Sequence, residues 1–158
     1  MNVLEQKVDA LIRLNLAASV EDRVHYRNVL VGLMTGKKAV GTVREEADAM
    51  LTELGVSPHL MGYAFALEAI CITVEDPKAT THGNIYSLWS KTADICSASP
   101  RSVERCIRHA VERCFDNCDP DLITRYFGYT VSMDSGKLTC GEFVAGCARI
   151  IRKKVYGK

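Results

Sequence analysis

Apolar residues recur at helical spacing along most of the chain. Two helices are predicted before Thr42, the first from about Val3 to Ala17 and the second beginning at Ser19, a residue type that favours the N-cap position. The segment from Thr35 to Lys38 is expected to end the second helix. Each helix carries an apolar stripe, and the pair is too small to form a core alone. We therefore expect residues 1–43 to form a helical hairpin used for self-association or partner contact.

The remaining residues predict six more helices. Their expected ranges are 43–54, 57–74, 85–96, 100–116, 120–127 and 139–154. The helix at 57–74, opened by Ser57-Pro58, is apolar on most faces, which is typical of a central core helix. Residues 128–138 are expected to be a loop, with a brief extended stretch around Tyr129 to Met133. The pattern thus predicts an all-α protein, in which a domain at 44–158 follows the hairpin at 1–43.

The helices at 85–96 and 100–116 are predicted to form a helix-turn-helix. The three residues Ser97-Ala98-Ser99 connect them, which is the length such a motif uses. Ser99-Pro100 is a strong helix start, with a serine N-cap followed by proline at the first helical position. Ala93 is small where the two helices would cross, and the branched Val103 would return to the core. The motif is expected to span about Trp89 to Phe115.

The second helix of this motif divides into two faces. Its apolar side carries Val103, Cys106, Ile107, Ala110 and Cys114. Its polar side carries Arg101, Arg105, Arg108 and Glu112, flanked by Ser102, Glu104, His109 and Arg113. On one interpretation the arginines enter a DNA major groove and pair with guanine edges and phosphates, while Glu104 accepts from a cytosine amino group. On the other it is a solvated charged face of a core helix, and the pattern alone leaves both open.

Local charge is more informative than the net charge of +1. The segment Arg149 to Lys158 contains five basic groups and no acidic one. Its residues Arg149, Arg152, Lys153 and Lys154 have two interpretations. They are either a solvated helix end favoured by the helix dipole, or contacts to a DNA backbone that carry no sequence information.

Several classes of protein are disfavoured. The chain lacks an apolar run long enough for a bilayer and an uninterrupted apolar signal-peptide core, so we expect a cytoplasmic protein with no membrane partner. The seven cysteines suggest no disulfide framework. Cys106, His109, Cys114 and Cys118 fit no common zinc spacing, so no metal or other cofactor is expected. We see no catalytic constellation and expect no enzyme activity.

The sequence resembles the C-terminal DNA-binding domain of the sporulation-initiation response regulator (stage 0 sporulation protein A) of endospore-forming bacteria. The resemblance runs from about Arg44 to Lys154. It is carried by Glu53-Leu54-Gly55-Val56, His59, Gly62-Tyr63, Glu68-Ala69-Ile70, the run from Val103 to Ala110, the run from Phe127 to Met133, and Glu142-Phe143. The run from Val103 to Ala110 and the Phe-Gly-Tyr-Thr-Val motif at 127–131 are together highly specific.

The resemblance implies a six-helix fold with a helix-turn-helix that binds TGTCGAA-like boxes, often as a tandem dimer. It places Glu104, Arg105 and Arg108 at recognition positions, with His109 beside them. The partners implied are double-stranded DNA, an RNA polymerase sigma factor and a second copy of the chain. The family usually has serine or threonine followed by arginine before Val-Glu-Arg, whereas this chain has Arg101-Ser102. That arginine is displaced by about 100° around the helix.

The family's regulator carries a phosphoacceptor receiver domain before this module. Residues 1–43 contain four acidic groups and predict two helices, so we expect no receiver and no switching by receiver phosphorylation. Two functional hypotheses follow. The chain is either a sequence-specific transcription regulator, or an interaction protein that pairs with the full-length regulator or competes for its sites. Glu104, Arg105 and Arg108 favour the first, and the Arg101-Ser102 order leaves room for the second.

Overall fold

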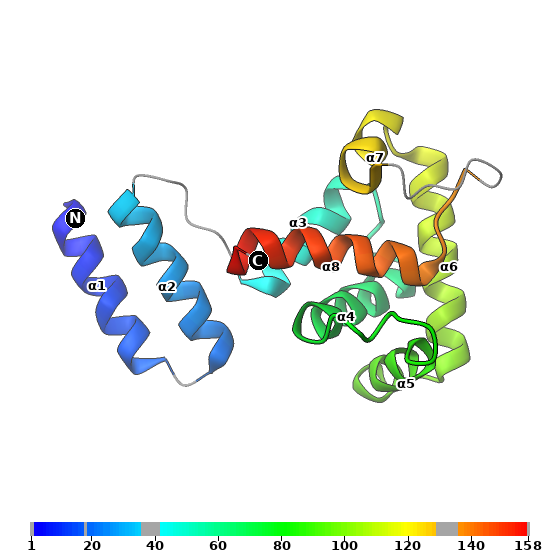
Figure 1. Ribbon diagram of the computed structural model, residues 1–158, viewed down its shortest axis with the longest axis horizontal. Helices are drawn as coiled ribbons and strands as arrows, with labels where there is room; N and C mark the ends of the chain where they lie inside the picture. The colour runs from blue at the N-terminus through cyan, green and yellow to red at the C-terminus, as the bar shows by residue number, and fades with distance from the viewer. Residues whose placement is uncertain (1, 18, 36–41, 129–135, 158) are drawn as a thin grey trace. The chain divides into compact units, whose positions relative to one another are not determined.

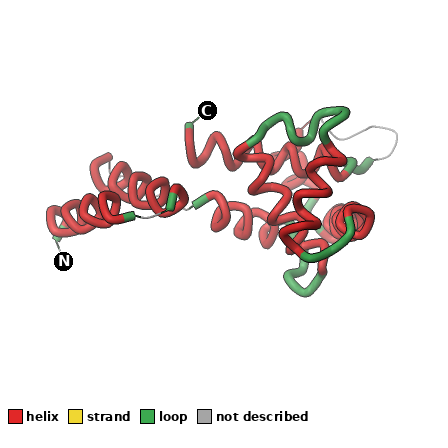
Figure 2. The backbone as a smooth tube through the Cα atoms, turned by 90° about the horizontal axis from the view of Figure 1, so that it is seen from below, coloured by secondary structure: helices red, strands yellow, loops and turns green. Residues whose placement is uncertain are grey.

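The computed structural model describes residues 2–17, 19–35, 42–128 and 136–157. Over these residues it contains helices and no strand, which confirms the predicted all-α class (Figures 1 and 2). The helices are α1 (Val3–Leu16), α2 (Val20–Thr35), α3 (Val43–Glu53), α4 (Met61–Glu75), α5 (Ile85–Cys96), α6 (Pro100–Asn117), α7 (Pro120–Phe127) and α8 (Cys140–Tyr156). Of the helices described, none is long and apolar enough to cross a membrane.

The chain divides into two compact units. One consists of residues 1–46 together with 152–158, and the other of residues 47–151. In the first unit, the last turns of α8 lie beside the start of α3, where the ammonium group of Lys154 bonds the carboxylate of Glu46. The second unit holds α4 to α7 with most of α3 and α8, and therefore contains the helix-turn-helix.

The helical hairpin of the first unit forms as the sequence predicts. A capping box starts α1, because the Asn2 side chain accepts a 2.8 Å hydrogen bond from the Glu5 backbone while the Glu5 carboxylate accepts one from the Asn2 backbone. The Ser19 hydroxyl accepts a 3.0 Å bond from the Asp22 backbone N–H, which caps α2. The helices lie antiparallel (Figure 1). Residues 36–41, where the predicted end of α2 falls, lie outside the described residues.

The central core helix is present, but its predicted start at Ser57 is wrong. Residues 57–60 form a turn closed by a 3.1 Å bond from the Leu60 backbone N–H to the Ser57 carbonyl, and α4 begins at Met61. The helix is buried on most of its surface and packs against both α5 and α6. Its buried residues are Gly62, Tyr63, Phe65, Ala66, Ala69, Ile70, Thr73 and Val74. The predicted extended stretch at 129–133 lies outside the described residues.

Helix α3 is tied to its neighbours by tyrosine hydroxyls. The hydroxyl of Tyr63 on α4 donates to the carboxylate of Asp48, and the hydroxyl of Tyr126 on α7 donates to that of Glu53. Burial is the main cause that raises the pKa of both phenols, and the two carboxylates add to it. Because both bonds join residues from different helices, they fix α4 and α7 against α3.

Helix α7 closes the core against α8. The rings of Phe127 and Phe143 lie with their centroids 5.5 Å apart, a favourable aromatic contact. A β-carbon built on Gly146 would lie 2.8 Å from the Phe127 ring, so only glycine lets α8 approach α7 this closely. Phe127, Phe143 and the neighbouring Val144 are buried.

Candidate nucleic-acid interface

The turn between α5 and α6 has the connection of a helix-turn-helix. Ser97 ends α5 in the left-handed region, at φ 54°, and its backbone N–H bonds the Ala93 carbonyl. The Ala98 N–H bonds the same carbonyl at 2.9 Å. The Ser99 hydroxyl then caps α6 by accepting a 3.2 Å bond from the Ser102 backbone N–H. Pro100 occupies the first helical position, as expected from the sequence.

Helix α6 buries one side completely. The buried residues are Val103, Ile107, Ala110, Val111 and Cys114. Ala93 of α5 is buried where the two helices meet, as its small size predicts. Since this apolar side anchors α6 to α4 and α5, the opposite side is fixed in its orientation toward solvent.

The solvent side of α6 carries most of the basic residues predicted to bind DNA. Its exposed members are Arg101, Arg105, Arg108, His109 and Arg113, while Ser102 and Glu104 are half-buried. These seven lie on the first four turns of one helix in the second compact unit. Lys153 is also exposed, but it lies in the last turn of α8 and belongs to the first unit.

Arg108 is bound to Glu104 one turn earlier on the same face. The guanidinium donates to the Glu104 carboxylate, and this bond is the largest cause of a pKa of Arg108 above its ordinary value. The thiol of Cys140 donates to the Glu104 backbone carbonyl at 3.7 Å. Burial raises the pKa of this thiol, so it remains protonated beside α6. The arrangement holds a carboxylate and a guanidinium next to each other on an exposed surface.

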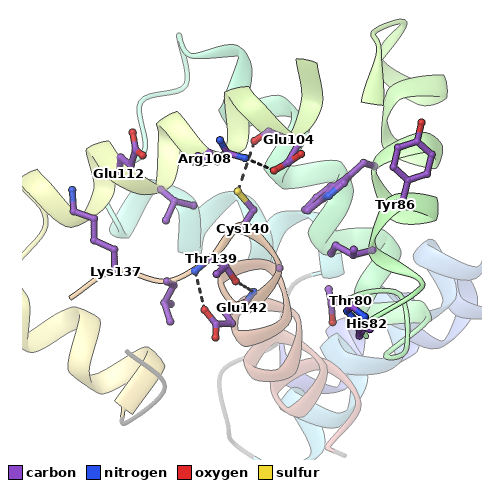
Figure 3. A pocket seen from close by; sticks show the side chains of 15 residues that line it. Thr80, His82, Tyr86, Glu104, Arg108, Glu112, Lys137, Thr139, Cys140 and Glu142 are labelled. Carbon is purple, nitrogen blue, oxygen red and sulfur yellow. Dashed lines mark hydrogen bonds and ion pairs between the residues drawn. The ribbon is translucent and has the colours of Figure 1, made fainter. Parts of the chain in front are cut away.

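A cleft of about 910 Å³ runs along this edge of α6 (Figure 3). Glu104, Arg108 and Glu112 line it from α6, and Tyr86 lines it from α5. The start of α8 closes another side, where Thr139 and Glu142 cap the helix reciprocally. The other lining residues are Thr80, His82, Ile85, Trp89, Val111, Lys137, Leu138, Cys140 and Gly141.

Tyr86 and Lys137 are among the polar residues of the cleft that sequence reasoning missed. Tyr86 is an exposed aromatic residue at the start of α5, and Lys137 lies just before α8, where it pairs with Asp116 at 3.0 Å. The exposed tyrosine ahead of the apolar stripe of α5 is a weak sequence signal. The position of Lys137 depends on the packing of α8 against α6, for which local spacing gives no signal.

The cysteines and histidines that resemble metal ligands are divided between surfaces. Cys114 is buried in the core, Cys106 and Cys118 are half-buried, and His109 is exposed. Burial is the largest cause that raises the pKa of Cys114 to about 12, which disfavours the thiolate that a metal requires. In the part of the chain that the structure describes, no three histidine, cysteine or acidic side chains are grouped as metal ligands.

A comparison with protein families agrees with this geometry. The family model described as "Sporulation initiation factor Spo0A C terminal" matches residues 47–151. The match spans α4 to α7 entirely, with most of α3 and α8, and so includes the whole helix-turn-helix. A match over this share of the chain, with an all-helical fold and an arginine-bearing second helix, confirms the resemblance found in the sequence. The chain therefore belongs to the family of C-terminal, DNA-binding domains of the sporulation initiation factor.

Proposed function

We propose that this chain is a sequence-specific transcription regulator that reads a TGTCGAA-like box by inserting the N-terminal half of α6 into the major groove. The observation that supports this most is the division of α6 into a completely buried side and an exposed side with four arginines. Arg105 and Arg108 are three residues apart on the exposed side and project in similar directions. In a groove, each can pair bidentately with a guanine.

The Glu104–Arg108 ion pair gives this proposal a specific mechanism. In the free protein the two side chains bind each other. On the matching box, Arg108 exchanges the carboxylate for a guanine edge, and Glu104 accepts from a cytosine amino group. On other sequences Arg108 loses its carboxylate partner without an equivalent replacement. The pair therefore penalises binding to the wrong bases.

Tyr86 and Lys137 are proposed as contacts to the DNA backbone beside the groove. Both line the cleft that Arg108 also lines, and both side chains are exposed. Contacts of this kind fix the orientation of a protein on the duplex without reading bases. Lys153 and the other basic residues of α8 are proposed to contribute in the same way from the end of that helix.

The test is the affinity for the family box and for a scrambled duplex, measured by fluorescence anisotropy at two salt concentrations. Arg105→Ala should cost about 1–3 kcal/mol on the box and much less on the scrambled duplex. Arg125→Ala, at an exposed arginine in the last turn of α7, is the matched control. It should leave the affinity for the box and the affinity for the scrambled duplex unchanged. Equal, weak binding to both duplexes that Arg105→Ala leaves unchanged would reject the proposal.

Two further variants separate base reading from backbone binding. Ser102→Arg restores an arginine at the family's usual position and should move the preference toward the family box. Lys153→Ala should weaken binding to every sequence alike and reduce the slope of log affinity against log salt by about one. If Lys153→Ala instead changes the preferred sequence, its role as a backbone contact is wrong.

The alternative is an interaction protein that pairs with the full-length regulator or competes for its sites. The exposed apolar residues of α1 and the Arg101-Ser102 order favour this alternative. The same titration separates the proposal from an interaction protein that binds only the regulator, because such a protein shows no preference for the box. In either case we propose residues 44–158 as the DNA-binding part and residues 1–43 as an accessory hairpin.

A further inference from the structure

Helix α1 is apolar on two opposite sides. Its inner side faces α2, where Ala10 is completely buried and lines a gap with Val29 and Leu33. Its other side, called here the outer face, carries five large aliphatic residues. Their exposed fractions are 69% for Leu4, 50% for Val8, 48% for Leu11, 51% for Ile12 and 77% for Leu16.

The five aliphatic residues of the outer face lie on one side of the helix. With 100° between successive residues, they fall within an arc of about 140° along the whole helix, which the exposed Glu5 and Asn15 share. Single exposed aliphatic residues are common on proteins, but a contiguous row of them usually marks an interaction site. A helix with apolar residues on both sides is typically covered on both.

We propose that the outer face of α1 binds the same face of a second copy of the chain, with the two helices antiparallel. Four of the five residues, Leu4, Val8, Ile12 and Leu16, are placed symmetrically about position 10. An antiparallel pair centred there places Val8 opposite the partner copy's residue 12 and Leu4 opposite its residue 16. Leu11 then lies next to the two-fold axis. An isologous contact of this kind requires a self-complementary surface, and the spacing of the row provides one.

The helix dipoles of α1 favour the antiparallel arrangement. Antiparallel pairing opposes the two dipoles, which a parallel pair would align unfavourably. The side-chain charges do not select a direction, because Arg13 and Asp9 pair with each other within the helix at 2.8 Å.

The area is sufficient for a reversible dimer. Mutual burial of the two outer faces removes on the order of 1,000 Å² of surface, counted over both copies, which is near the lower limit for a specific interface. An interface of this size predicts micromolar rather than nanomolar association. The proposal does not depend on which bases α6 reads.

The first test is the mass of the full chain by sedimentation velocity across a micromolar concentration series. The wild type should shift from the 17.4 kDa monomer to a species of twice that mass. Val8→Glu should remain monomeric over the same range, because it buries an unpaired carboxylate in the interface. Circular dichroism of the variant checks that the helices are retained.

The matched control places the same charge on α2. Val20→Glu replaces a more exposed valine that is not part of the outer face of α1, and it should dimerise like the wild type. A wild type that stays monomeric throughout the series would overturn the proposal and indicate that the outer face is covered within one chain. A Val8→Glu variant that dimerises as well as the control would also overturn it.

A charge-exchange experiment tests the antiparallel register. Ile12→Lys should be monomeric alone, as Val8→Glu is. An equimolar mixture of the two variants should form a heterodimer, because the glutamate of one chain then faces the lysine of the other. A parallel pair would place residue 8 against residue 8, and mixing would restore nothing. A mixture that remains monomeric therefore contradicts the antiparallel arrangement.

Base reading by α6 is tested separately from dimerisation. The affinity of the monomeric Val8→Glu variant for the family box measures it.

Discussion

Gly62 on α4 lies directly against the backbone of Cys106 on α6. A β-carbon built on Gly62 would lie 2.2 Å from the Cys106 carbonyl oxygen and 2.9 Å from the β-carbon of Ala110. The first of these atoms belongs to a helix backbone and has no side-chain freedom with which to move. The absence of a side chain at Gly62 therefore sets the distance between the core helix and the helix that carries the arginines.

Gly62→Ala should accordingly destabilise the fold and misplace α6. The added methyl group forces α4 and α6 apart, an overpacking that typically costs about 1–3 kcal/mol. Urea unfolding measures the loss of stability, and box affinity should fall because the arginines move. Gly141→Ala is the control, since its new β-carbon would meet only the flexible end of Ile85, at 3.3 Å. Equal stability of the two variants would contradict this account.

Ser97→Gly should stabilise the protein. Ser97 is the one non-glycine residue with positive φ in the part of the chain that the structure describes, and that conformation costs a side chain about 1–2 kcal/mol. Glycine removes this strain but loses more entropy on folding, so we expect a net gain of about 0.5–1 kcal/mol. Ser90→Gly in the middle of α5 makes the same chemical change at a helical position and should destabilise. Urea unfolding measures the free energy of unfolding of both variants against the wild type.

Tyr126 should make stability fall in alkaline solution. Burial, with the Glu53 carboxylate, raises the pKa of Tyr126 to about 12 from an ordinary value of 10.0. Above pH 10 the unfolded chain loses this proton while the folded chain keeps it, so the free energy of unfolding decreases until the pH passes about 12. Tyr126→Phe should remove this part of the pH dependence. Tyr86→Phe controls for the loss of one tyrosine from the absorbance signal.

The seven cysteines should react with a thiol reagent in two groups. Cys71, Cys96, Cys106 and Cys118 are half-buried, whereas Cys114, Cys140 and Cys147 are buried. Burial is the main cause that raises the pKa of all three buried thiols, which lowers their thiolate fraction as well as their access. Mass spectrometry after limited alkylation should find the first group modified before the second. Early modification of Cys147 would indicate that α8 opens.

Local signals explain which parts of the fold could be predicted from the sequence. The starts of α6 and α7 were predicted correctly because each has an N-cap residue followed by proline, at Ser99-Pro100 and Asp119-Pro120. Ser57-Pro58 carries the same signal, but there it forms a turn. Helix α4 begins at Met61, where no side chain caps it. Its start is therefore not encoded in the local capping pattern.

The candidate site divides in the same way. The arginine face of α6 could be predicted because its residues recur within one helix. The cleft beside it could not, since Tyr86 and Lys137 reach it from other elements through the packing of α5 and α8. The Glu104–Arg108 pair lies between these cases, because its i,i+4 spacing is visible in the sequence but the choice between pairing and base contact is not.

The bonds from Tyr63 to Asp48 and from Tyr126 to Glu53 use neutral donors for the carboxylates of α3. Dissolved ions screen the attraction between opposite charges, but they weaken a hydrogen bond from a phenol much less. DNA binding depends on the release of counterions and is lost steeply as salt increases. Concentrated salt should therefore detach this protein from DNA while its helices stay packed. Ionic strength can then control whether the protein is bound to DNA without unfolding it.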